Sequence, residues 1–454
     1  MSDMNTSVIP IKGSVSGVGI ALIWLAANLV VTTLLTGTLF VPGVTYGTAI
    51  AAIVVGTLLG ALILTMIAVM GTRTGLSTMA LARGSFGIRG ATLPTTANII
   101  ILMGWSWVQA MLAGISINYI IEQQTGYSNP ILFSALCQVI VVVLAIFGHD
   151  GIAKIEPYLG LVILGIVIYI FAVAFTTYSP AEYFAIPADK SLEYTGMSVF
   201  DIVFATAISW TVLSADLTRT ARTQRGGAIG TALGYSTSTI TAMTLGATAI
   251  SFVLLRGGEV ASFDPTVIIE SFGWPLAIAI FLSVTATNTM VVYGMATSAQ
   301  TIVPRTNPLP FLPTALVLGA ISVAGATWLA MLDQFTNFLV LIGAFFIPVF
   351  AIMIIDYYVA RRRTYAHDIL RTQGGRYWFT GGVNIGAVAT WIIGCGVYLL
   401  FTFVWPLPIG ASLPTIVLSA ASYLLFTKLM RIEEPADTRS IHLTESISVV
   451  NAEQ

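Results

Sequence analysis

Charged residues are scarce in this chain of 454 residues, at 9% of the sequence, whereas soluble domains have about 25%. Its net charge of −1 gives no sign of a nucleic-acid partner. Cysteine is also rare, because only Cys137 and Cys395 occur, and both fall in apolar stretches. This excludes a disulfide framework and a paired metal site.

Motifs for hydrolysis and nucleotide binding are missing as well. The sequence contains no HExxH, CxxC, GxxxxGK[ST] or GxSxG pattern, and these patterns carry metallohydrolase, redox, ATP-driven and serine-hydrolase chemistry. Three histidines, at 149, 367 and 442, are far apart in the sequence. We therefore expect neither an enzyme nor a cofactor.

Long apolar stretches make up most of the chain instead, and 56% of the residues are hydrophobic. A hydrocarbon core about 30 Å thick requires about 20 apolar residues per helix. The sequence predicts twelve such spans, near 19–40, 47–70, 93–120, 130–148, 157–178, 198–215, 228–255, 274–303, 311–331, 334–360, 381–403 and 409–430. We expect an all-α membrane protein surrounded by lipid, with tails at 1–15 and 432–454 and a transmembrane domain at 16–431.

Positive charges are concentrated on one side of these spans. If the N-terminus is cytoplasmic, Lys190 and Arg256 are the only lysine and arginine residues that fall outside. The positive-inside rule then places both termini in the cytoplasm, with the chain crossing the cell (inner) membrane many times.

The twelve spans divide into two groups of five and a remaining pair. Because five is odd, spans 6 to 10 run upside down relative to spans 1 to 5. This pattern predicts a five-plus-five inverted repeat with two additional helices, the repeats covering about 19–178 and 198–360 and the additional helices 381–430. In transporters with such repeats, the binding site lies near the bilayer midplane, where broken helices expose backbone groups.

Two basic loops on the cytoplasmic side contain recognisable patterns. The Gly-rich segment 71–92 carries three arginines and no acid, and we expect a short amphipathic helix there, lying along the membrane surface. Segment 356–378 mixes arginines with aromatic residues, which favours a role in anchoring at the interface.

Span 3 contains the most informative pair, Trp105 and Gln109, in MGWSWVQAML. Four residues apart, they share one face of a helix. An indole can stack on a flat ring, while an amide can donate and accept hydrogen bonds at the edge of that ring. The alternative is that Trp105 packs against a neighbour and Gln109 bridges two helices.

Spans 1 and 6 offer further polar or aromatic candidates. Trp210 in span 6 could line a site or serve as a core or interfacial aromatic. Asp201 is a carboxylate near the outer end of span 6, either functional at membrane depth or a helix-start residue favoured by the helix dipole. Asn28 is a lone amide in span 1, which can either line a site or form hydrogen bonds within the protein.

Span 8 is rich in hydroxyl groups. Its segment SVTATNTMVVYG contains Ser283, Thr285, Thr287, Asn288 and Thr289. Hydroxyls and free backbone carbonyls can replace the water around a sodium ion. Threonines in helices also bond their own backbone, so each can equally be structural.

These residues resemble the nucleobase:cation symporter-1 family, which includes hydantoin, cytosine, purine and allantoin transporters. The resemblance runs from about residue 14 to 430. Its most specific marks are GTRTGLSTMALARGSFGIRG before span 3, GW followed by Gln109, AD near the end of span 6, and DYYVARRR after span 10. The family fold is a five-plus-five inverted repeat with two extra helices.

The resemblance implies a substrate site. Trp105 matches the ring-stacking tryptophan of the family, and Gln109 matches the amide that hydrogen-bonds the hydantoin ring. The second stacking position falls on Ala207, with Trp210 one turn later. Val30 stands where the hydantoin transporter has a glutamine. Thr289, Met290 and Val292 lie where relatives carry acidic or amide groups, so the substrate edge is expected to be recognised differently here.

The resemblance also implies a cation site. Ala26 and Leu29 match positions whose carbonyls bind sodium, and Ser283, Ala286 and Thr287 match a carbonyl and two hydroxyls. Because Ala286 has no hydroxyl, either Thr285 substitutes for it or the coupling ion is a proton. The resulting expectation is a sodium-coupled symporter that imports a nucleobase or related planar nitrogen heterocycle by alternating access. The alternative is proton-coupled uptake of a pyrimidine vitamin precursor or another heterocycle. A channel or a receptor without transport is the rival class, and the oligomeric state stays open.

Overall fold

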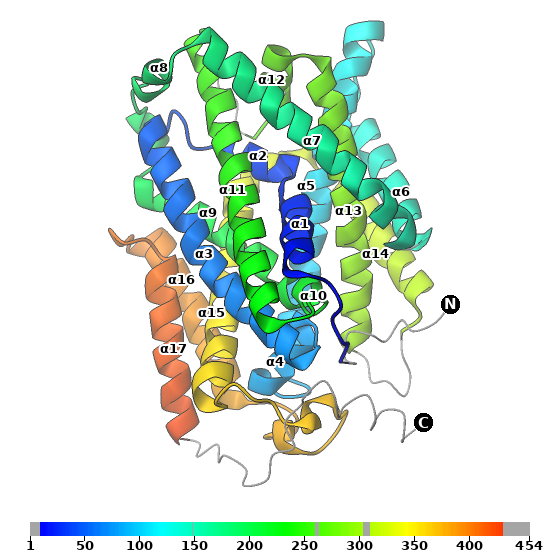
Figure 1. Ribbon diagram of the computed structural model, residues 1–454, viewed down its shortest axis with the longest axis vertical. Helices are drawn as coiled ribbons and strands as arrows, with labels where there is room; N and C mark the ends of the chain where they lie inside the picture. Colours follow the sequence, from blue (N-terminus) through cyan, green and yellow to red (C-terminus); the bar gives the residue numbers. More distant parts are fainter. Residues whose placement is uncertain (1–9, 148, 259–262, 303–308, 430–454) are drawn as a thin grey trace.

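The computed structural model describes residues 10–147, 149–258, 263–302 and 309–429, and side chains are not described at 149–162 and 301. The predicted tails therefore lie mostly outside the described residues. Within them, the regular elements are helical (Figure 1). The α-helices are α1 Gly17–Asn28, α2 Val31–Thr38, α3 Tyr46–Thr74, α4 Thr78–Phe86, α5 Thr92–Thr125, α6 Pro130–Phe147, α7 His149–Thr177, α8 Pro180–Phe184, α9 Gly196–Thr211, α10 Ser214–Thr218, α11 Gln224–Leu255, α12 Pro265–Phe272, α13 Trp274–Ile302, α14 Phe311–Gly325, α15 Phe335–Ile355, α16 Ile385–Leu399 and α17 Ser412–Leu429.

Short helical turns complete the chain. They are 3₁₀ turns at Lys190–Leu192 (η1), Leu329–Gln334 (η2), His367–Leu370 (η4) and Arg376–Trp378 (η5), and π-helical turns at Asp356–Ala360 (η3) and Leu400–Val404 (η6). The π-helical turns directly continue α15 and α16.

Membrane-spanning helices dominate the structure. Among the described residues, eight helices are long and apolar enough to cross a bilayer, or nine if the bent pair α1 and α2 forms one span. Three further predicted spans correspond to shorter apolar helices, at Ile163–Thr177, α9 and α14. The expectation of an all-α, multi-pass membrane protein is confirmed, whereas the helices of spanning length are fewer than the twelve predicted.

The helices pack in three groups (Figure 1). The first contains α1, α2, α3, α9, α10 and α11, the second α5, α6, α13 and α14, and the third α15, α16 and α17. Helix α7 contacts both α11 and α13, so it crosses from the first group to the second. Figure 1 shows α7 running diagonally across the upper front of the molecule.

Glycines let α11 approach the first two helices closely. A Cβ added at Gly234 would lie 2.3 Å from the carbonyl oxygen of Ala21 in α1, and one at Gly246 would lie 1.9 Å from that of Leu34 in α2. Small residues allow such backbone approach between membrane helices. These contacts hold both halves of the bent pair against one straight helix.

The basic segment 71–92 contains a short helix, α4, that is buried in protein. Every residue of α4 except Arg83 is buried. The helix packs against α15 and the turns η3, η4 and η5, because the loop after α15 covers the face that we expected to meet lipid headgroups. The prediction of a surface amphipathic helix is therefore wrong.

Candidate functional site

Two helices break near the middle of the first group. The chain bends by 58° between α1 and α2, at Leu29 and Val30. A second break separates α9 from α10, at Val212 and Leu213. Helix ends leave backbone N–H and C=O groups without helical partners, and inside a membrane such groups are tolerated only where they line a cavity or meet protein.

Both breaks border a pair of adjoining cavities. The tryptophan cavity, of about 40 Å³, is lined among others by Thr36, Trp105, Gln109, Thr206, Ser209 and Trp210. The serine cavity, of about 60 Å³, is lined among others by Ala26, Val30, Ser283, Ala286, Thr287 and Met290. Trp210, Leu213, Thr287 and Val291 line both cavities and form their common wall. The cavities thus lie between the first and second groups of helices.

Aromatic neighbours hold the two indoles of the tryptophan cavity. The ring of Trp105 meets Phe335 and Phe338 edge-to-face, with centroids 5.7 and 5.5 Å apart. The ring of Trp210 meets Trp24 of α1 in the same way, at 6.4 Å. Edge-to-face packing fixes an indole in place, so the orientation of each ring is set by residues outside the cavity.

The amide of Gln109 lines the tryptophan cavity and has an unpartnered oxygen. Gln109 is only 3% exposed, and its Oε1 atom has no hydrogen-bond partner among the described residues. A buried carbonyl oxygen without a partner costs about 1–3 kcal/mol. A donor group on a molecule in the cavity would remove that cost.

Hydroxyl groups gather in the serine cavity on one face of α13. Ser283 is 2% exposed, and its hydroxyl has no partner among the described residues. Thr287, one turn later, donates its hydroxyl proton to the carbonyl oxygen of Ser283 at 3.0 Å, which directs the lone pairs of Thr287 Oγ1 elsewhere. Ala286 lines the same cavity without a polar side chain.

Four of the predicted site residues do not line either cavity. Asn28 is fully buried and donates to Ser238 at 3.1 Å and to Thr239, both in α11. It also accepts from Thr33 at 3.3 Å. Its amide therefore holds the break between α1 and α2 to α11, and does not face the cavities.

Leu29, Ala207 and Thr289 are the other three. Leu29 lies at the break itself, where its N–H donates to the carbonyl of Leu25. Ala207 is fully buried against Gly60 of α3, and it is absent from the lining of both cavities. Thr289 is fully buried and donates to its own helix, at the carbonyl of Thr285.

Asp201 acts as a cap for a helix distant in sequence. Its carboxylate accepts hydrogen bonds from the backbone N–H groups of Ala411 and Ser412, at 2.8 and 3.1 Å. Ser412 is the first residue of α17 and Ala411 directly precedes it, and a carboxylate is favoured at a helix N-terminus. We expected any such role to concern the start of its own helix, whereas Asp201 lies inside α9 and stabilises a different one.

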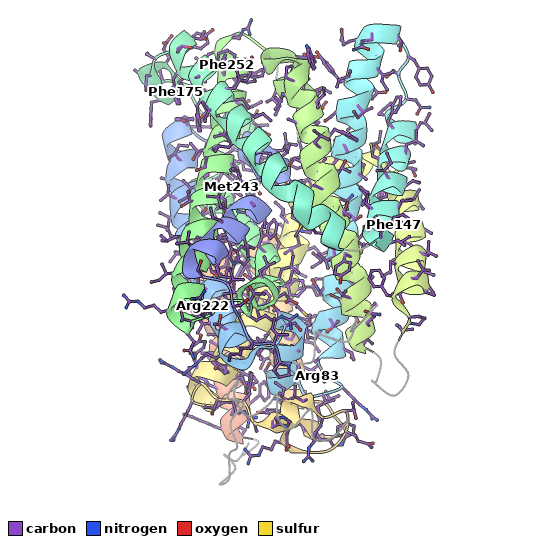
Figure 2. All side chains as sticks on the ribbon, turned by 45° about the vertical axis from the view of Figure 1, so that its right-hand side comes forward. Arg83, Phe147, Phe175, Arg222, Met243 and Phe252 are labelled. Atoms are coloured by element: carbon purple, nitrogen blue, oxygen red, sulfur yellow. The ribbon has the colours of Figure 1, made fainter. Side chains whose placement is uncertain are left out.

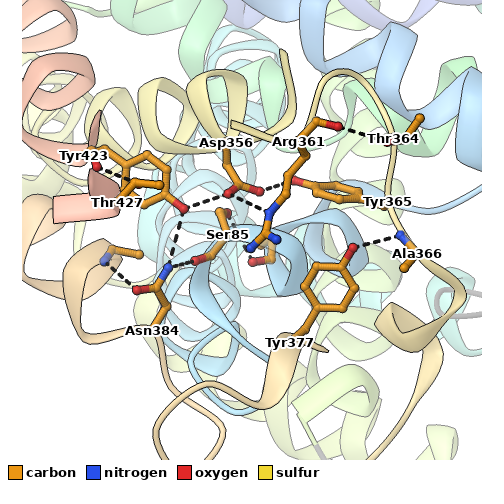
Figure 3. A network of polar contacts seen from close by, with 12 residues as sticks. Ser85, Asp356, Arg361, Thr364, Tyr365, Ala366, Tyr377, Asn384, Tyr423 and Thr427 are labelled. Carbon is orange, nitrogen blue, oxygen red and sulfur yellow. Dashed lines mark hydrogen bonds and ion pairs between the residues drawn. The ribbon is translucent and has the colours of Figure 1, made fainter. Parts of the chain in front are cut away.

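The segment after α15 takes part in a buried polar network that also includes Ser85 of α4 (Figure 3). Asp356 accepts from the hydroxyls of Tyr365 and Tyr423, at 3.0 and 2.8 Å, and pairs with Arg361 at 3.5 Å. Asn384 donates to the carbonyl of Ser85 in α4 at 2.7 Å. Burial, with the adjacent Asp356 carboxylate, raises the pKa of Tyr365 well above its ordinary value, so its hydroxyl stays protonated and keeps donating.

This network gives the segment a structural role that the sequence did not indicate. Besides α4 and α15, the network includes α17 through Tyr423. Residues 356–378 therefore join helices from several parts of the chain.

Sequence reasoning also missed several residues that line the cavities. Thr206 and Ser209 of α9 lie in the tryptophan cavity, although both hydroxyls donate to carbonyls of their own helix. The available signal was their position in the sequence, because Thr206 lies one turn before Trp210 and Ser209 directly precedes it. Leu213 and Val291 carried no polar signal at all.

Broken membrane helices that border a binding site are typical of secondary transporters. The fold matches solved transporters over nearly the whole chain. The match to the inward-facing conformation of Mhp1 has a TM-score of 0.79 at 21% identity, covering 95% of this chain and 94% of that one. The match to the closed conformation of Mhp1, "a nucleobase-cation-symport-1 family transporter" with bromovinylhydantoin bound, has a TM-score of 0.75 at 21% identity, covering 96% and 98%.

Sequence comparison supplies the family. Residues 16–419 match the family described as "Permease for cytosine/purines, uracil, thiamine, allantoin". The chain is also 27% identical over 385 residues to the putative purine-cytosine permease YxlA of Bacillus subtilis, covering 80% of this chain and 79% of the relative. This chain belongs to the nucleobase:cation symporter-1 family, as its sequence indicated. It is a membrane transporter and not an enzyme.

Proposed function

We propose that this transporter imports a nucleobase or a related planar nitrogen heterocycle, such as a hydantoin or allantoin, by symport with a cation. The ring lies between Trp105 and Trp210, and Gln109 binds its edge. The observation that supports this most strongly is that all three side chains, from two separate helices, line one cavity. The names of related proteins, a putative purine-cytosine permease and a transporter with a hydantoin bound, favour the same class of substrate.

Sodium is the cation that we propose. The proposed ligands are the carbonyls of Ala26 and Ser283 and the hydroxyl of Thr287, from residues that line the serine cavity. The carbonyl of Leu29, which precedes the lining residue Val30 at the break between α1 and α2, completes the proposed set. Ala286 has no hydroxyl to bind the ion. We propose that the hydroxyl of Ser283 binds it instead, because this hydroxyl belongs to a residue that lines the same cavity and has no hydrogen-bond partner among the described residues.

The composition of the cavities favours sodium over a proton. Among the described residues that line the two cavities, none is an aspartate, glutamate or histidine. A proton carrier needs a group that titrates, whereas hydroxyls and carbonyls bind sodium without one.

Twelve spans in a five-plus-five inverted repeat with two additional helices are the architecture that fits this function. Each predicted span overlaps one of the eight long helices, the bent pair α1 and α2, or one of the three shorter apolar helices. In the assignment proposed here, one repeat covers about 19–178, the other about 198–360, and α16 and α17 follow them.

We place both termini, with their tails at 1–15 and 432–454, in the cytoplasm. Both ends of the described chain lie toward the end of the molecule that contains α4 (Figure 1). Arg83 and Arg222 lie toward that end, and Phe175 and Phe252 toward the opposite one (Figure 2). The positive-inside rule makes the arginine-rich side cytoplasmic.

The shared wall explains how ion and substrate would cooperate. Trp210 and Thr287 line both cavities, so an ion that orders Thr287 also orders a residue of the substrate cavity. Each ligand then favours the conformation that the other binds, and the coupling is reciprocal. Alternating access follows when the two groups of helices shift around the cavities.

Uptake into sealed vesicles tests this function. Purified protein reconstituted with an inward sodium gradient should accumulate one labelled heterocycle from a panel of nucleobases, hydantoins and allantoin. Trp105→Leu should weaken binding by about 5- to 150-fold, because base stacking contributes about 1–3 kcal/mol. Trp107→Leu, on the same helix but packed against Gly325 of α14, is the matched control.

The possible outcomes separate the alternatives. Equal binding by the two variants would reject the stacking role. Uptake that ignores sodium but collapses when a proton gradient is dissipated would reject sodium and leave the heterocycle in place. Equilibration without accumulation would indicate a channel.

A further inference from the structure

A cluster of four polar side chains lies within the second group of helices, outside both cavities. Each comes from a different helix, and each is fully buried. They are Ser106 of α5, Gln138 of α6, Asn288 of α13 and Ser322 of α14. We refer to them as the amide cluster.

Gln138 lies at the centre of the amide cluster. Its Nε2 donates to the hydroxyls of Ser106 and Ser322, at 3.0 and 2.9 Å, and those hydroxyls bond each other at 2.6 Å. Its Oε1 accepts from Nδ2 of Asn288 at 2.7 Å. Asn288 Nδ2 also donates to the backbone carbonyl of Ser106 at 3.0 Å. A single amide therefore bonds side chains on three other helices.

Two members of the cluster are sequence neighbours of residues that line the cavities. Ser106 follows Trp105, and Asn288 follows Thr287. Successive residues of an α-helix point about 100° apart, so each helix presents one residue to a cavity and the next to the cluster. The hydrogen bonds from Asn288 to Gln138 and to the Ser106 carbonyl thus link the backbone that carries Thr287 to the backbone that carries Trp105.

Hydrophobic packing alone would not fix this arrangement. Apolar side chains tolerate small sliding between helices, whereas a hydrogen-bonded polar network favours one register, because a shift leaves further buried donors and acceptors without partners. Within the amide cluster, only Oδ1 of Asn288 lacks a hydrogen-bond partner among the described residues. Breaking such bonds costs about 1–3 kcal/mol for each buried group left unpaired. In the described structure, the cluster therefore fixes the position of α5 relative to α13 along the helix axes.

We propose that Gln138 is a positioning residue for coupling: it fixes the height of Thr287 relative to Trp105, so that the ion and the ring are bound in one geometry. This inference rests on the proposed function, since it concerns the communication between the same two cavities. Gln138 touches neither cavity itself, because it is absent from the lining of both. Its effect is therefore expected on the coupling between ligands more than on either binding site alone.

The test measures heterocycle binding to the full-length protein in detergent, without sodium and at saturating sodium. The ratio of the two dissociation constants is the coupling factor. In Gln138→Leu, which keeps a similar volume but forms no hydrogen bond, we expect the coupling factor to fall by about 2- to 30-fold, the range for residues that transmit coupling. Sodium-free affinity should change less.

Cys137→Ala is the matched control, because Cys137 is the neighbouring residue of α6, is 4% exposed and is not in the amide cluster. It should lower thermal stability without changing the coupling factor. A residue with a merely structural role would behave in the same way when substituted. A Gln138→Leu protein that melts earlier but keeps the wild-type coupling factor would therefore overturn the inference.

Further variants keep the test decisive if Gln138→Leu does not fold. Gln138→Leu combined with Asn288→Leu removes both amides together, which avoids an orphaned partner. Ser322→Ala removes one hydroxyl from α14 and leaves the bond between the amides, so it should reduce the coupling factor less than the double variant. Equal, wild-type coupling in both would reject the role of the cluster. Wild-type protein that binds the heterocycle without any response to sodium would instead refute the proposed sodium coupling, and this inference with it.

Discussion

The carboxylate of Asp216 accepts a hydrogen bond at 3.0 Å from the backbone N–H of Thr78. In return, the hydroxyl of Thr78 accepts one at 3.1 Å from the backbone N–H of Ala215. These bonds join α10 to the first turn of the buried helix α4. Since Asp201 caps α17 from the other half of the same broken helix, a carboxylate anchors each side of the break that lines the cavities.

The first prediction concerns this anchor. Asp216→Ala should lower the free energy of unfolding by about 0.5–2 kcal/mol, the usual cost of losing a helix cap. Thermal unfolding in detergent measures it. Asp216→Asn keeps an acceptor oxygen, so its free energy of unfolding should fall much less. Equal melting temperatures for the alanine and asparagine variants would show that the hydrogen bond does not contribute to stability.

The second prediction separates Trp210 from Ala207. Trp210→Ala should weaken binding of every heterocycle by about 5- to 150-fold, because it removes one stacking face. Ala207→Leu should leave affinity unchanged but destabilise the fold by about 1–3 kcal/mol through overpacking, since Ala207 lies against Gly60 of α3. Measuring the affinity and the melting temperature of both variants distinguishes a residue of the substrate site from a packing residue. Altered ligand selectivity in Ala207→Leu would instead indicate that Ala207 belongs to the substrate site.

The third prediction concerns substrate selection by Gln109. Gln109→Leu should change the order in which unlabelled bases and hydantoins compete with the labelled substrate, because ligand donors lose the acceptor that distinguishes them. Leu102→Ala, which changes another lining residue of the same cavity, should weaken all ligands by similar factors. A rank order that survives in Gln109→Leu would mean that the amide does not bind the substrate edge.

The fourth prediction tests the proposed ion ligands. Ser283→Ala and Thr287→Ala should each raise the sodium concentration for half-maximal effect by about tenfold or more, because hydrogen-bond-strength contacts to a charge contribute about 1.5–3 kcal/mol. Thr285→Ala is the control, since Thr285 also has a buried hydroxyl without a partner among the described residues but does not line either cavity.

Ala286→Ser completes this series by adding a hydroxyl. It should lower the half-maximal sodium concentration. If Thr285→Ala is as damaging as Thr287→Ala, the ion lies on another face of α13.

The sequence predicted the membrane class and the meeting of Trp105 with Gln109, because spacing of four on a helix is independent of tertiary detail. It did not predict where the helices break. Neither Leu29 and Val30 nor Val212 and Leu213 contain the Gly or Pro that usually marks a break. Those positions depend on packing between distant segments, which a local pattern does not record.

The polar residues of the spans show the same limit. From the sequence, the amide of Asn28 could contact a ligand or form hydrogen bonds within the protein. It does the second because its partners are Ser238 and Thr239, more than 200 positions away. Ala207 and Trp210 are three residues apart, and only the position of α3 determines which of them faces the cavities. Residue type identified candidates for the site, whereas long-range contacts selected among them.

The wall common to the two cavities has a consequence for inhibition. A molecule long enough to reach from Gln109 past Trp210 to Ser283 would occupy both cavities at once. It would compete with the heterocycle and with the ion, so raising the concentration of either alone would not fully displace it. Such a compound would also bridge α5, α9 and α13, and would hold the transporter in a single state.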